Sequence, residues 1–363
     1  MIPLWKLKRE AIRLGRKANA LPWYFRGRLR RWLYDRQRTS RLTVTEGAQP
    51  ARPEMAVLLI YQPAGLIAST FLTLDYLADQ GVSAVVVSNT RLTLADRARL
   101  AARSHLVIER PNVGYDFGGY REGVMTLLER GGKLDALYVL NDSIWFPLTR
   151  DSDAMARLRA NEADVVGLLM GNAGKPSPEH EYIQSYFFRF SGRLIAHPDF
   201  ARYWREMPLV DDKYLVVHRF ERFVSRHFKQ RGFKVSALTH WSELADSLAR
   251  IEDEATLRAI FTHQSGVAPK DYNAIAPRLA AGASARALRD DLAPGVANHE
   301  LFASTVHAHP VLLMDMRLAF LKKRIEAQHA ELVRFGLLER LDPVIQAEIA
   351  AARPEDSEPA GPL

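Results

Sequence analysis

The chain has 363 residues, 47% of them hydrophobic and 25% charged, so it can bury a sizeable core in one large domain or two ordinary ones. The absence of cysteine excludes disulfides and thiolate metal sites, which leaves oxygen and imidazole as metal ligands. The net charge of +8 is uneven, because residues 1–52 hold 14 Lys and Arg against 3 Asp and Glu, whereas the remainder holds 36 against 39. A near-neutral body with a basic arm indicates that only the arm meets an anionic surface.

The basic arm, residues 1–52, has two stretches with the apolar spacing of an amphipathic helix. The first stripe is Leu4, Leu7, Ala11, Leu14 and Ala18, and after Pro22 the second is Phe25, Leu29, Trp32 and Leu33. Basic amphipathic helices with tryptophans predict attachment to an anionic membrane surface. Packing of both stripes on the body is an equal alternative, because periodicity does not separate the two. Nucleic-acid binding is not expected, since no binding motif accompanies the charge.

No apolar run reaches the roughly 18 residues of a membrane span, and the chain turns basic at Lys6 before a signal-peptide core can form. We therefore expect a cytoplasmic protein, with peripheral contact to the inner face of the cytoplasmic membrane through the arm.

From residue 53 the sequence alternates between short apolar runs and helical periods. The runs predict strands over 55–61, 83–88, 106–109, 136–140 and 165–169, with helices over 71–77 and 94–102. This alternation predicts an α/β fold with a mostly parallel sheet flanked by helices, in a domain over residues 53–240. An aromatic strand over 183–190, one long helix over 212–231, an edge strand over 235–238, a helical region over 241–345 and a disordered tail over 346–363 are expected after it.

Ligands of such sheets bind outside the carboxyl ends of the strands, so polar residues just after each run are candidates. The turn after the third run holds Asn112, Gly114, Tyr115 and Asp116, and Asn89 follows the second run. Asn112 and Asp116 suit the base, ribose or sugar of a nucleotide donor, with the glycines allowing close approach of the backbone. The alternative is that Asp116 is a plain helix N-cap in a tight turn.

The fourth run ends in a second polar turn, Asn141-Asp142-Ser143. A carboxylate flanked by amide and hydroxyl oxygens suits Mg²⁺ or Mn²⁺ that keeps several waters and bridges to a substrate diphosphate. The alternative, favoured by spacing alone, is that Asp142 only caps the next segment. A third cluster, residues 178–187, places Glu181 and His180 beside an aromatic run, where one group is suited to act as a general base.

Linked motifs over residues 55–325 resemble the rhamnan synthesis protein F family. They are NVGYDFGGYREG (112–123), YVLNDSIWFPL (138–148), IQSYFFRFSG (183–192), HPDFARYWREM (197–207), DKYLVVHRFERFVSRHFKQRGFKV (212–235) and HPVLLMDMRLAFLKKRI (309–325). The resemblance implies a GT-A-like glycosyltransferase whose donor is a nucleoside-diphosphate sugar, typically dTDP-L-rhamnose. It also implies an acceptor that is a lipid-linked or polysaccharide chain, such as a lipopolysaccharide O-chain.

On this resemblance Asn141-Asp142-Ser143 takes the place of an Asp-x-Asp metal motif, with Asp142 as its only carboxylate, which puts strict metal dependence in question. Tyr182 stands where the family has a histidine. The site implied has Asp142 on the metal, with Glu181 as the base and Asp116 as a second catalytic group. The donor-binding residues are Asn89, Asn112, Gly114, Tyr115, Asp116, Asn141, Ser143 and Gln184. An inverting reaction follows if a β-linked donor gives an α-linked product. A non-catalytic member that binds a nucleotide sugar or glycan within a synthesis complex is the alternative.

Overall fold

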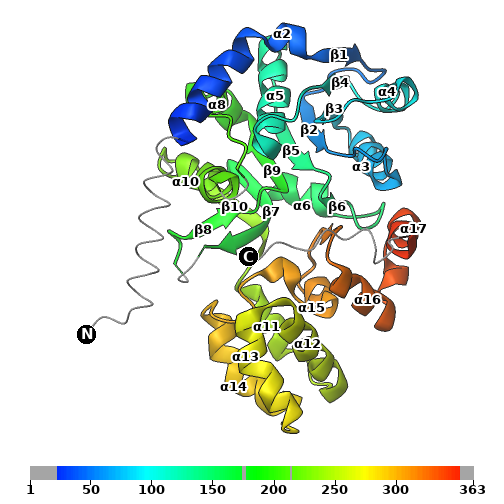
Figure 1. The fold of residues 1–363 in the computed structure, drawn as a ribbon, viewed down its shortest axis with the longest axis vertical. Coiled ribbons are helices and arrows are strands. Elements are labelled where there is room, and N and C mark those ends of the chain that lie inside the picture. Colours follow the sequence, from blue (N-terminus) through cyan, green and yellow to red (C-terminus); the bar gives the residue numbers. More distant parts are fainter. Residues whose placement is uncertain (1–22, 174–176, 213–214, 352–363) are drawn as a thin grey trace.

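The computed structural model describes residues 23–173, 177–212 and 215–351, and these form a nine-stranded sheet with helices on both faces (Figure 1). The strand order is β1-β4-β3-β2-β5-β9-β7-β10, with β8 paired to β7. The strands are β1 (Thr43–Glu46), β2 (Glu54–Ile60), β3 (Ser83–Ser88), β4 (Leu106–Glu109), β5 (Ala136–Asn141), β7 (Val165–Asn172), β8 (Glu181–Ile183), β9 (Phe187–Ser191) and β10 (Val235–His240). The expected α/β fold with a mostly parallel sheet is thus confirmed.

Four neighbouring strands, β4, β3, β2 and β5, run parallel, so their carboxyl ends share one edge of the sheet. β9 runs antiparallel between β5 and β7, which gives β7 the direction of β5, and β10 is parallel to β7. The edge that carries the ends of β2 to β5 therefore also carries the ends of β7 and β10 and the start of β9.

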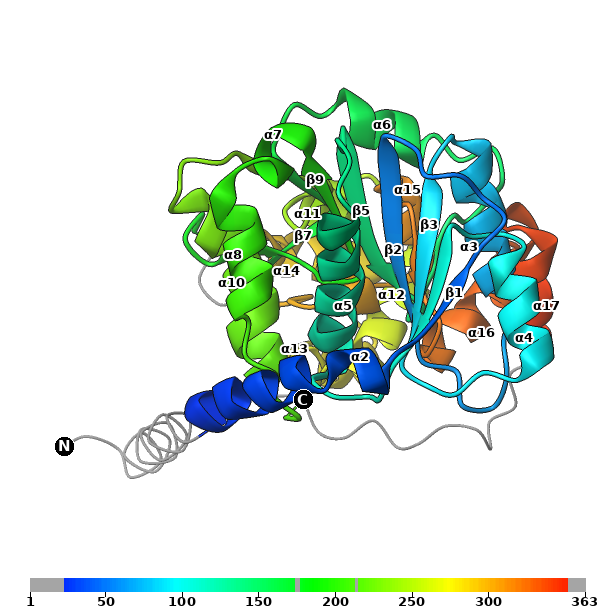
Figure 2. The same cartoon turned by 90° about the horizontal axis from the view of Figure 1, so that it is seen from above.

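The central strands consist of continuous apolar runs because both of their faces are covered. In β2, Leu58 and Ile60 belong to the core on one face, and Val57 and Leu59 belong to the core on the other. The first core includes side chains of α3 (Ala68–Asp79), α4 (Leu94–Ala101) and α6 (Ala154–Ala160). The second includes those of α5 (Tyr115–Arg130), α7 (Gly192–Ile195), α8 (Pro198–Glu206) and α10 (Arg222–Lys229), and the two sets lie on opposite sides of the sheet (Figure 2).

The chain after residue 242 is mainly helical and gathers at one end of the sheet (Figure 1). Its helices are α11 (Glu243–Ala249), α12 (Glu254–Val267), α13 (Pro269–Ala280), α14 (Ala285–Ala297), α15 (Pro310–Asp315), α16 (Glu326–Arg334) and α17 (Pro343–Ala351). A short strand, β11 (Leu321–Lys322), pairs antiparallel with β6 (Ile144–Trp145), directly after β5. Phe261, Leu313 and Ile345 lie in the same core as α3 and β2, so this region is continuous with the sheet.

The described part of the basic arm packs one side on the body and exposes the other. Residues 23–36 are helical and are followed by α2 (Arg38–Arg41). On the inner side, Arg38 forms a salt bridge with Glu122 at 2.6 Å, and Asp35 forms one with Arg121 at 2.8 Å. The apolar side chains Tyr24, Phe25, Leu29, Trp32 and Leu33 are between 46% and 63% exposed. The second stripe of the arm is therefore left without a cover by the body, and the first stripe lies outside the described residues.

The structure differs from the sequence expectations in four places. The stretch 43–46, inside the arm, is strand β1 and extends the sheet through β4. The aromatic run 183–190 is split between β8 and β9, because residues 184–186 turn between two strands that both pair with β7. Part of the expected helix 212–231 is a π-helix over Val216–Glu221 that precedes α10. Residues 346–351 belong to α17 rather than to the tail, and residues 352–363 lie outside the described range.

Candidate functional site

The polar residues that follow the parallel strands come together at the carboxyl edge of the sheet. Gln62 follows β2, Asn89 follows β3, Asn112 follows β4 and Asp142 follows β5. The ends of adjacent parallel strands line the crevice where α/β sheets bind their ligands. The structure thus brings most of the expected donor-binding residues to one edge.

Asp142 is held at this edge by the loop after β2. Its Oδ2 atom accepts hydrogen bonds from the Tyr61 backbone N–H and from Gln62 Nε2, both at 2.9 Å. Its own N–H donates to the Leu59 carbonyl at 3.0 Å. Asp142 is half-buried, and its carboxylate binds the preceding loop rather than capping the segment that follows it. Its place is therefore fixed before any ligand binds.

Asn141 connects the two polar turns that the sequence singles out. Its Nδ2 atom donates to Asp116 Oδ2 at 3.0 Å, and its Oδ1 atom accepts from the Ser143 hydroxyl at 2.6 Å. Asp116 does not cap α5, because the N-cap is Gly114 and Asp116 lies in the first turn. The N-cap alternative for Asp116 is therefore wrong, and its carboxylate belongs to the same network as Ser143.

The glycines of this turn serve the packing of the protein itself. Gly114 has φ +82°, where a side chain is strained, and a Cβ atom there would lie 2.9 Å from Leu209 Cδ2. A Cβ atom on Gly119 would lie 2.3 Å from Leu59 Cδ1. Tyr115, which follows Gly114, also has a positive φ of 48°, and its side chain is 39% exposed. A strained backbone at an exposed aromatic residue, here beside Asp116, is typical of ligand sites.

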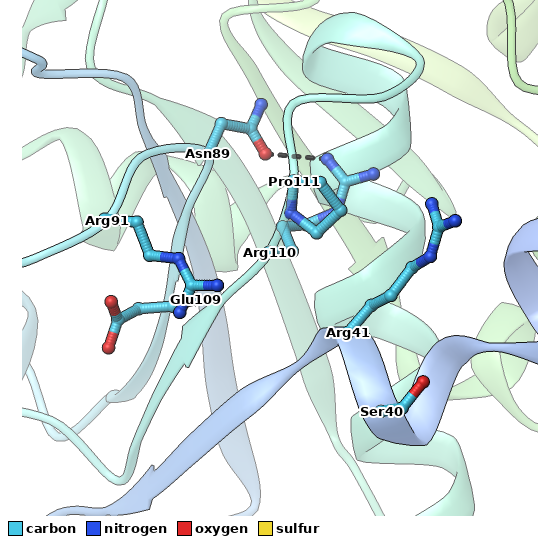
Figure 3. A pocket seen from close by; sticks show the side chains of 7 residues that line it. All are labelled: Ser40, Arg41, Asn89, Arg91, Glu109, Arg110 and Pro111. Atoms are coloured by element: carbon cyan, nitrogen blue, oxygen red, sulfur yellow. Dashed lines mark hydrogen bonds between the residues drawn. The ribbon is translucent and has the colours of Figure 1, made fainter.

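A cavity of about 350 Å³ lies at the ends of β3 and β4, and we call it the β4 pocket (Figure 3). Its lining residues are Ser40, Arg41, Asn89, Arg91, Glu109, Arg110 and Pro111. Arg110 donates to Asn89 Oδ1 at 2.7 Å, and Asn89 Nδ2 donates to Asn112 Oδ1 at 3.2 Å. Asn112 is not a lining residue, but it is joined to one by this hydrogen bond to Asn89. Polar groups held by one another in a small cavity are suited to a planar polar ligand group.

Four side chains influence the buried Tyr120 hydroxyl electrostatically, and we call Tyr120, Asp116, Asn141, Asp142 and Glu221 the Tyr120 cluster. The hydroxyl donates to the Ser185 carbonyl at 2.8 Å. Burial, followed by the charges of the three carboxylates, raises the pKa of Tyr120 well above its usual value. Tyr120 therefore stays neutral, and its hydroxyl feels the charges of Asp116 on α5, Asp142 in the turn after β5 and Glu221 at the end of the π-helix.

Glu221 is a candidate that the sequence analysis missed. The Ser185 N–H donates to its Oε1 atom at 3.2 Å, and burial raises the pKa of the carboxyl. A carboxylate with a raised pKa is suited to accept a proton near neutral pH. Nothing in the spacing of the 212–235 motif marks this residue, because its neighbours are Ser185 in the turn between β8 and β9 and Tyr120 on α5.

Glu181 and Gln184 lie farther along the same edge, beside β7 and β10. Glu181 Oε1 is 2.9 Å from His240 Nε2 and accepts from Trp241 Nε1 at 3.4 Å. Gln184 Oε1 is buried and has no hydrogen-bond partner among the described residues. An unsatisfied buried oxygen is unusual and leaves Gln184 with an acceptor available to a donor group of a ligand.

Two lysines reach the Asp142 turn from the helical C-terminal region. The Lys323 N–H donates to the Ser143 carbonyl at 3.1 Å, and Lys322 Nζ lies 3.4 Å from Ser143 Oγ. Burial lowers the pKa of Lys323, while the charge of Asp142 opposes that shift. The sequence analysis missed both residues, since they lie about 180 positions from the turn that they contact.

Comparison with known proteins decides the family. Residues 84–261 match the rhamnan synthesis protein F family. An uncharacterized protein, y4gN, of Sinorhizobium fredii is 36% identical over 96% of this chain and 92% of its own length. The chain belongs to the rhamnan synthesis protein F family. A virulence protein, VirA, of Vibrio anguillarum is 30% identical over 36% of this chain and 41% of its own length. Membership of the family supports a role in sugar transfer.

Two solved structures are similar at low scores. The first is Staphylococcus aureus TarS 1–349, with a TM-score of 0.26, 12% identity, and coverage of 40% of this chain and 49% of that one. The other is the mannosyltransferase PcManGT from Pyrobaculum calidifontis in complex with GDP-Man and Mn²⁺, with a TM-score of 0.31, 12% identity, and coverage of 94% and 96%.

The described residues contain no group of three or more His, Asp or Glu side chains that is arranged to hold a metal ion. Asp142 fits a metal only as a single carboxylate ligand, because its Oδ2 atom already accepts two hydrogen bonds and leaves Oδ1 for an ion. Mg²⁺ and Mn²⁺ bound through one carboxylate take their other ligands from water and phosphate oxygens. In a family member with this turn, Asp142 would hold the ion and the donor would complete its coordination.

Proposed function

We propose that this protein is a glycosyltransferase that moves a sugar, L-rhamnose foremost, from a nucleoside-diphosphate donor to a growing cell-envelope polysaccharide with inversion. The observation that carries the proposal is the Asp116–Asn141–Ser143 network, with Asp142 in the same turn at the carboxyl edge of a parallel sheet, in a member of the rhamnan synthesis protein F family. A GT-A-like donor site lies at this edge, and the product is an O-antigen or capsule type of glycan.

Each part of the edge has a role in this proposal. The β4 pocket, with Asn89 and Asn112, takes the nucleoside, while Gly114, Tyr115, Ser143 and Gln184 contact the rest of the donor. Asp116 and Asn141 bind the donor sugar. Asp142 lies beside the diphosphate, where a divalent cation would neutralise the charge that develops on the leaving group.

Two carboxylates compete for the role of the base that takes the acceptor proton. Glu181 is paired with His240, and Glu221 belongs to the Tyr120 cluster. Burial raises the pKa of Glu221, which favours it as a proton acceptor near neutral pH. Substitution of each by glutamine separates the two, because only the base variant loses turnover while it keeps its affinity for the donor.

Calorimetric titration of dTDP and UDP tests the proposal, in wild-type protein and Asp142→Ala, each with Mn²⁺ and with EDTA. We expect one nucleotide to bind, Asp142→Ala to weaken it, and the matching sugar nucleotide to be hydrolysed or transferred. Asp246→Asn, an exposed carboxylate on α11, is the matched control. If neither nucleotide binds, the glycosyltransferase proposal fails.

The single carboxylate of the Asp142 turn favours a second candidate, a non-catalytic member that binds a nucleotide sugar or glycan in a synthesis complex. This candidate predicts nucleotide binding without turnover of any sugar nucleotide. Donor hydrolysis with and without Mn²⁺ distinguishes it from the enzyme.

The exposed face of helix 23–36 supports peripheral attachment to an anionic membrane, beside a lipid-linked acceptor. Phe25 and Trp32 are 63% and 48% exposed, and the Arg36 guanidinium lies 4.2 Å from the centroid of the Trp32 ring. Aromatic and basic side chains on one face are suited to the headgroup boundary. Among the described helices, none is long and apolar enough to span a bilayer. Flotation with anionic vesicles, lost in Phe25→Ser/Trp32→Ser, tests the attachment, and salt-sensitive binding to duplex DNA instead would contradict it.

A further inference from the structure

One strand of the helical C-terminal region, β11, lies next to the Asp142 turn. Strand β11 pairs with β6 so that Leu321 is opposite Trp145 and Lys322 is opposite Ile144. The following N–H group, of Lys323, donates to the Ser143 carbonyl. These backbone hydrogen bonds fix the main chain of both lysines relative to the turn. The positions of the two positive charges are therefore not set by flexible side chains alone.

The two lysines are adjacent in the chain and are linked to the turn in different ways. Lys322 Nζ lies 3.9 Å from the centroid of the Tyr186 ring and 3.4 Å from Ser143 Oγ. Lys323 feels the charges of Asp142 and Glu348. The turn that supplies the carboxylate is therefore flanked by two positive charges.

Lys323 is in an environment that an anion would improve. Within the described part of the chain, no carboxylate forms a salt bridge with it inside 4.0 Å, although burial disfavours its charged form. An anionic ligand beside Lys323 would add to the effect of Asp142 and Glu348 and further stabilise its buried charge. Its position beside Ser143 places that ligand at the carboxyl edge of the sheet.

We propose that Lys322 and Lys323 bind the two phosphates of the donor and stabilise the nucleoside diphosphate as it leaves. The inference rests on the proposed function and extends it, since it gives the C-terminal region a part in the donor site. Two adjacent ammonium groups match the two charges of a diphosphate, and lysine binds phosphate as a point charge. The bond between the anomeric carbon and the diphosphate oxygen breaks with its electron pair on the diphosphate, while the acceptor oxygen forms the new bond and its proton passes to the carboxylate base. The lysines stabilise the charge that develops without donating a proton.

The two lysines also explain why a diphosphate site at this turn needs few residues that bind a metal ion. A metal at Asp142 has one protein carboxylate, whereas two lysines supply two positive charges without an ion. We therefore expect binding of nucleoside diphosphate to persist in EDTA, at reduced affinity, and to depend on both lysines under that condition.

Calorimetric titration of UDP or dTDP, and of the matching monophosphate, tests the inference in Lys322→Met, Lys323→Met and the double variant, with EDTA and with Mn²⁺. We expect the double variant to lose about ten- to hundredfold in affinity for the diphosphate, with the monophosphate almost unchanged. Arg324→Ala, at the exposed next position, is the control and should bind like wild type.

Thermal unfolding shows whether each methionine variant is folded. If one is not, Lys322→Gln and the charge-conserving Lys323→Arg replace it in the test. Lys322→Gln should lose diphosphate preference, and Lys323→Arg should keep most of it. Equal diphosphate affinity in wild type and the double variant would overturn the inference and leave the glycosyltransferase proposal intact. Failure of the wild-type protein to bind either nucleotide would overturn both.

Discussion

The β4 pocket and the Tyr120 cluster lie on the same edge of the sheet, yet they are assembled from different kinds of chain segment. The pocket is built mainly from residues at the ends of β3 and β4, where Arg110, Asn89 and Asn112 hold one another by hydrogen bonds. The cluster brings together α5, β5 and the π-helix, and β11 adds the lysines. The pocket therefore has the character of a rigid binding site, whereas the cluster gathers three carboxylates with two lysines beside them, as sites of chemistry do.

This difference predicts that changes in the cluster lower turnover, with or without a loss of affinity, whereas changes in the pocket affect affinity alone. The largest loss should follow Asp142→Ala. It removes the carboxylate from the edge, leaves the Tyr61 N–H without its acceptor and leaves Gln62 Nε2 with Thr70 Oγ1 alone. We expect turnover to fall about a thousandfold or more, as for loss of a group that stabilises charge in the transition state.

Asp142→Asn serves as the partner variant, because the amide oxygen keeps one acceptor for the loop but carries no charge. Steady-state rates with the cognate sugar nucleotide measure both. Equal activity of Asp142→Asn and wild type would mean that the charge has no role and that the site is not organised as proposed.

Glu221→Gln should give the next largest effect, a loss of about a hundredfold or more in kcat with donor affinity preserved, as expected for removal of a general base. Because burial raises the pKa of Glu221, the acid limb of the wild-type rate profile should lie above the usual range of a carboxyl group. The base must be deprotonated, so activity rises as pH increases through that raised pKa.

Glu181→Gln is the matched comparison for Glu221→Gln, since both carboxylates lie on the same edge. A larger loss of kcat in Glu181→Gln, together with an unchanged acid limb in Glu221→Gln, would assign the base to Glu181. The pH–rate profiles of the two variants are therefore the decisive measurement.

The pocket should respond in affinity rather than in rate. Asn89→Ala removes the acceptor of Arg110 and the donor to Asn112, so we expect the KM for the donor to rise about five- to tenfold with kcat nearly constant. Gln230→Ala, an exposed polar side chain after α10, is the control. A fall in kcat without a change in KM would show that the pocket takes part in the chemical step and would remove the distinction between the two sites.

The sequence predicted the part of the site that depends on local order. Continuous apolar runs located β3 and β4 to the residue, and the rule that parallel strands end at one edge identified Asn89, Asn112 and Asp142 as neighbours. Tertiary contacts determined the rest. Glu221 and Lys323 carry no spacing signal, because their partners are Ser185 and Ser143 in distant segments. The role of Gly119 was also hidden, since only the packed structure shows Leu59 against it.

The smallest effect we expect is a loss of stability on acidification, centred on the helical C-terminal region that delivers the lysines. His309 is buried at the start of α15, where its Nδ1 atom accepts from the Val311 N–H at 3.3 Å and its Nε2 atom lies 3.0 Å from Glu331. Burial lowers the pKa of His309 to about 4. The hydrogen bond to Glu331 opposes this shift, whereas the positive charges of His263 and Arg334 add to it. Protonation of Nδ1 would remove the acceptor that caps the helix.

Because the folded pKa of His309 lies below the unfolded value of 6.5, the unfolded chain binds more protons between these limits. Stability is therefore complete above about pH 6.5 and declines as pH falls toward 4, by on the order of 1–2 kcal/mol at pH 5 from this residue. Amide hydrogen exchange at pH 7 and pH 5 should show α15 and α16 losing protection before β3 and β4. His309→Gln should flatten the pH dependence, since glutamine does not titrate. Uniform loss of protection across the sheet and the C-terminal helices would mean that the two regions open as one unit. In that case, acidification would abolish nucleoside binding in the β4 pocket together with diphosphate binding at the lysines.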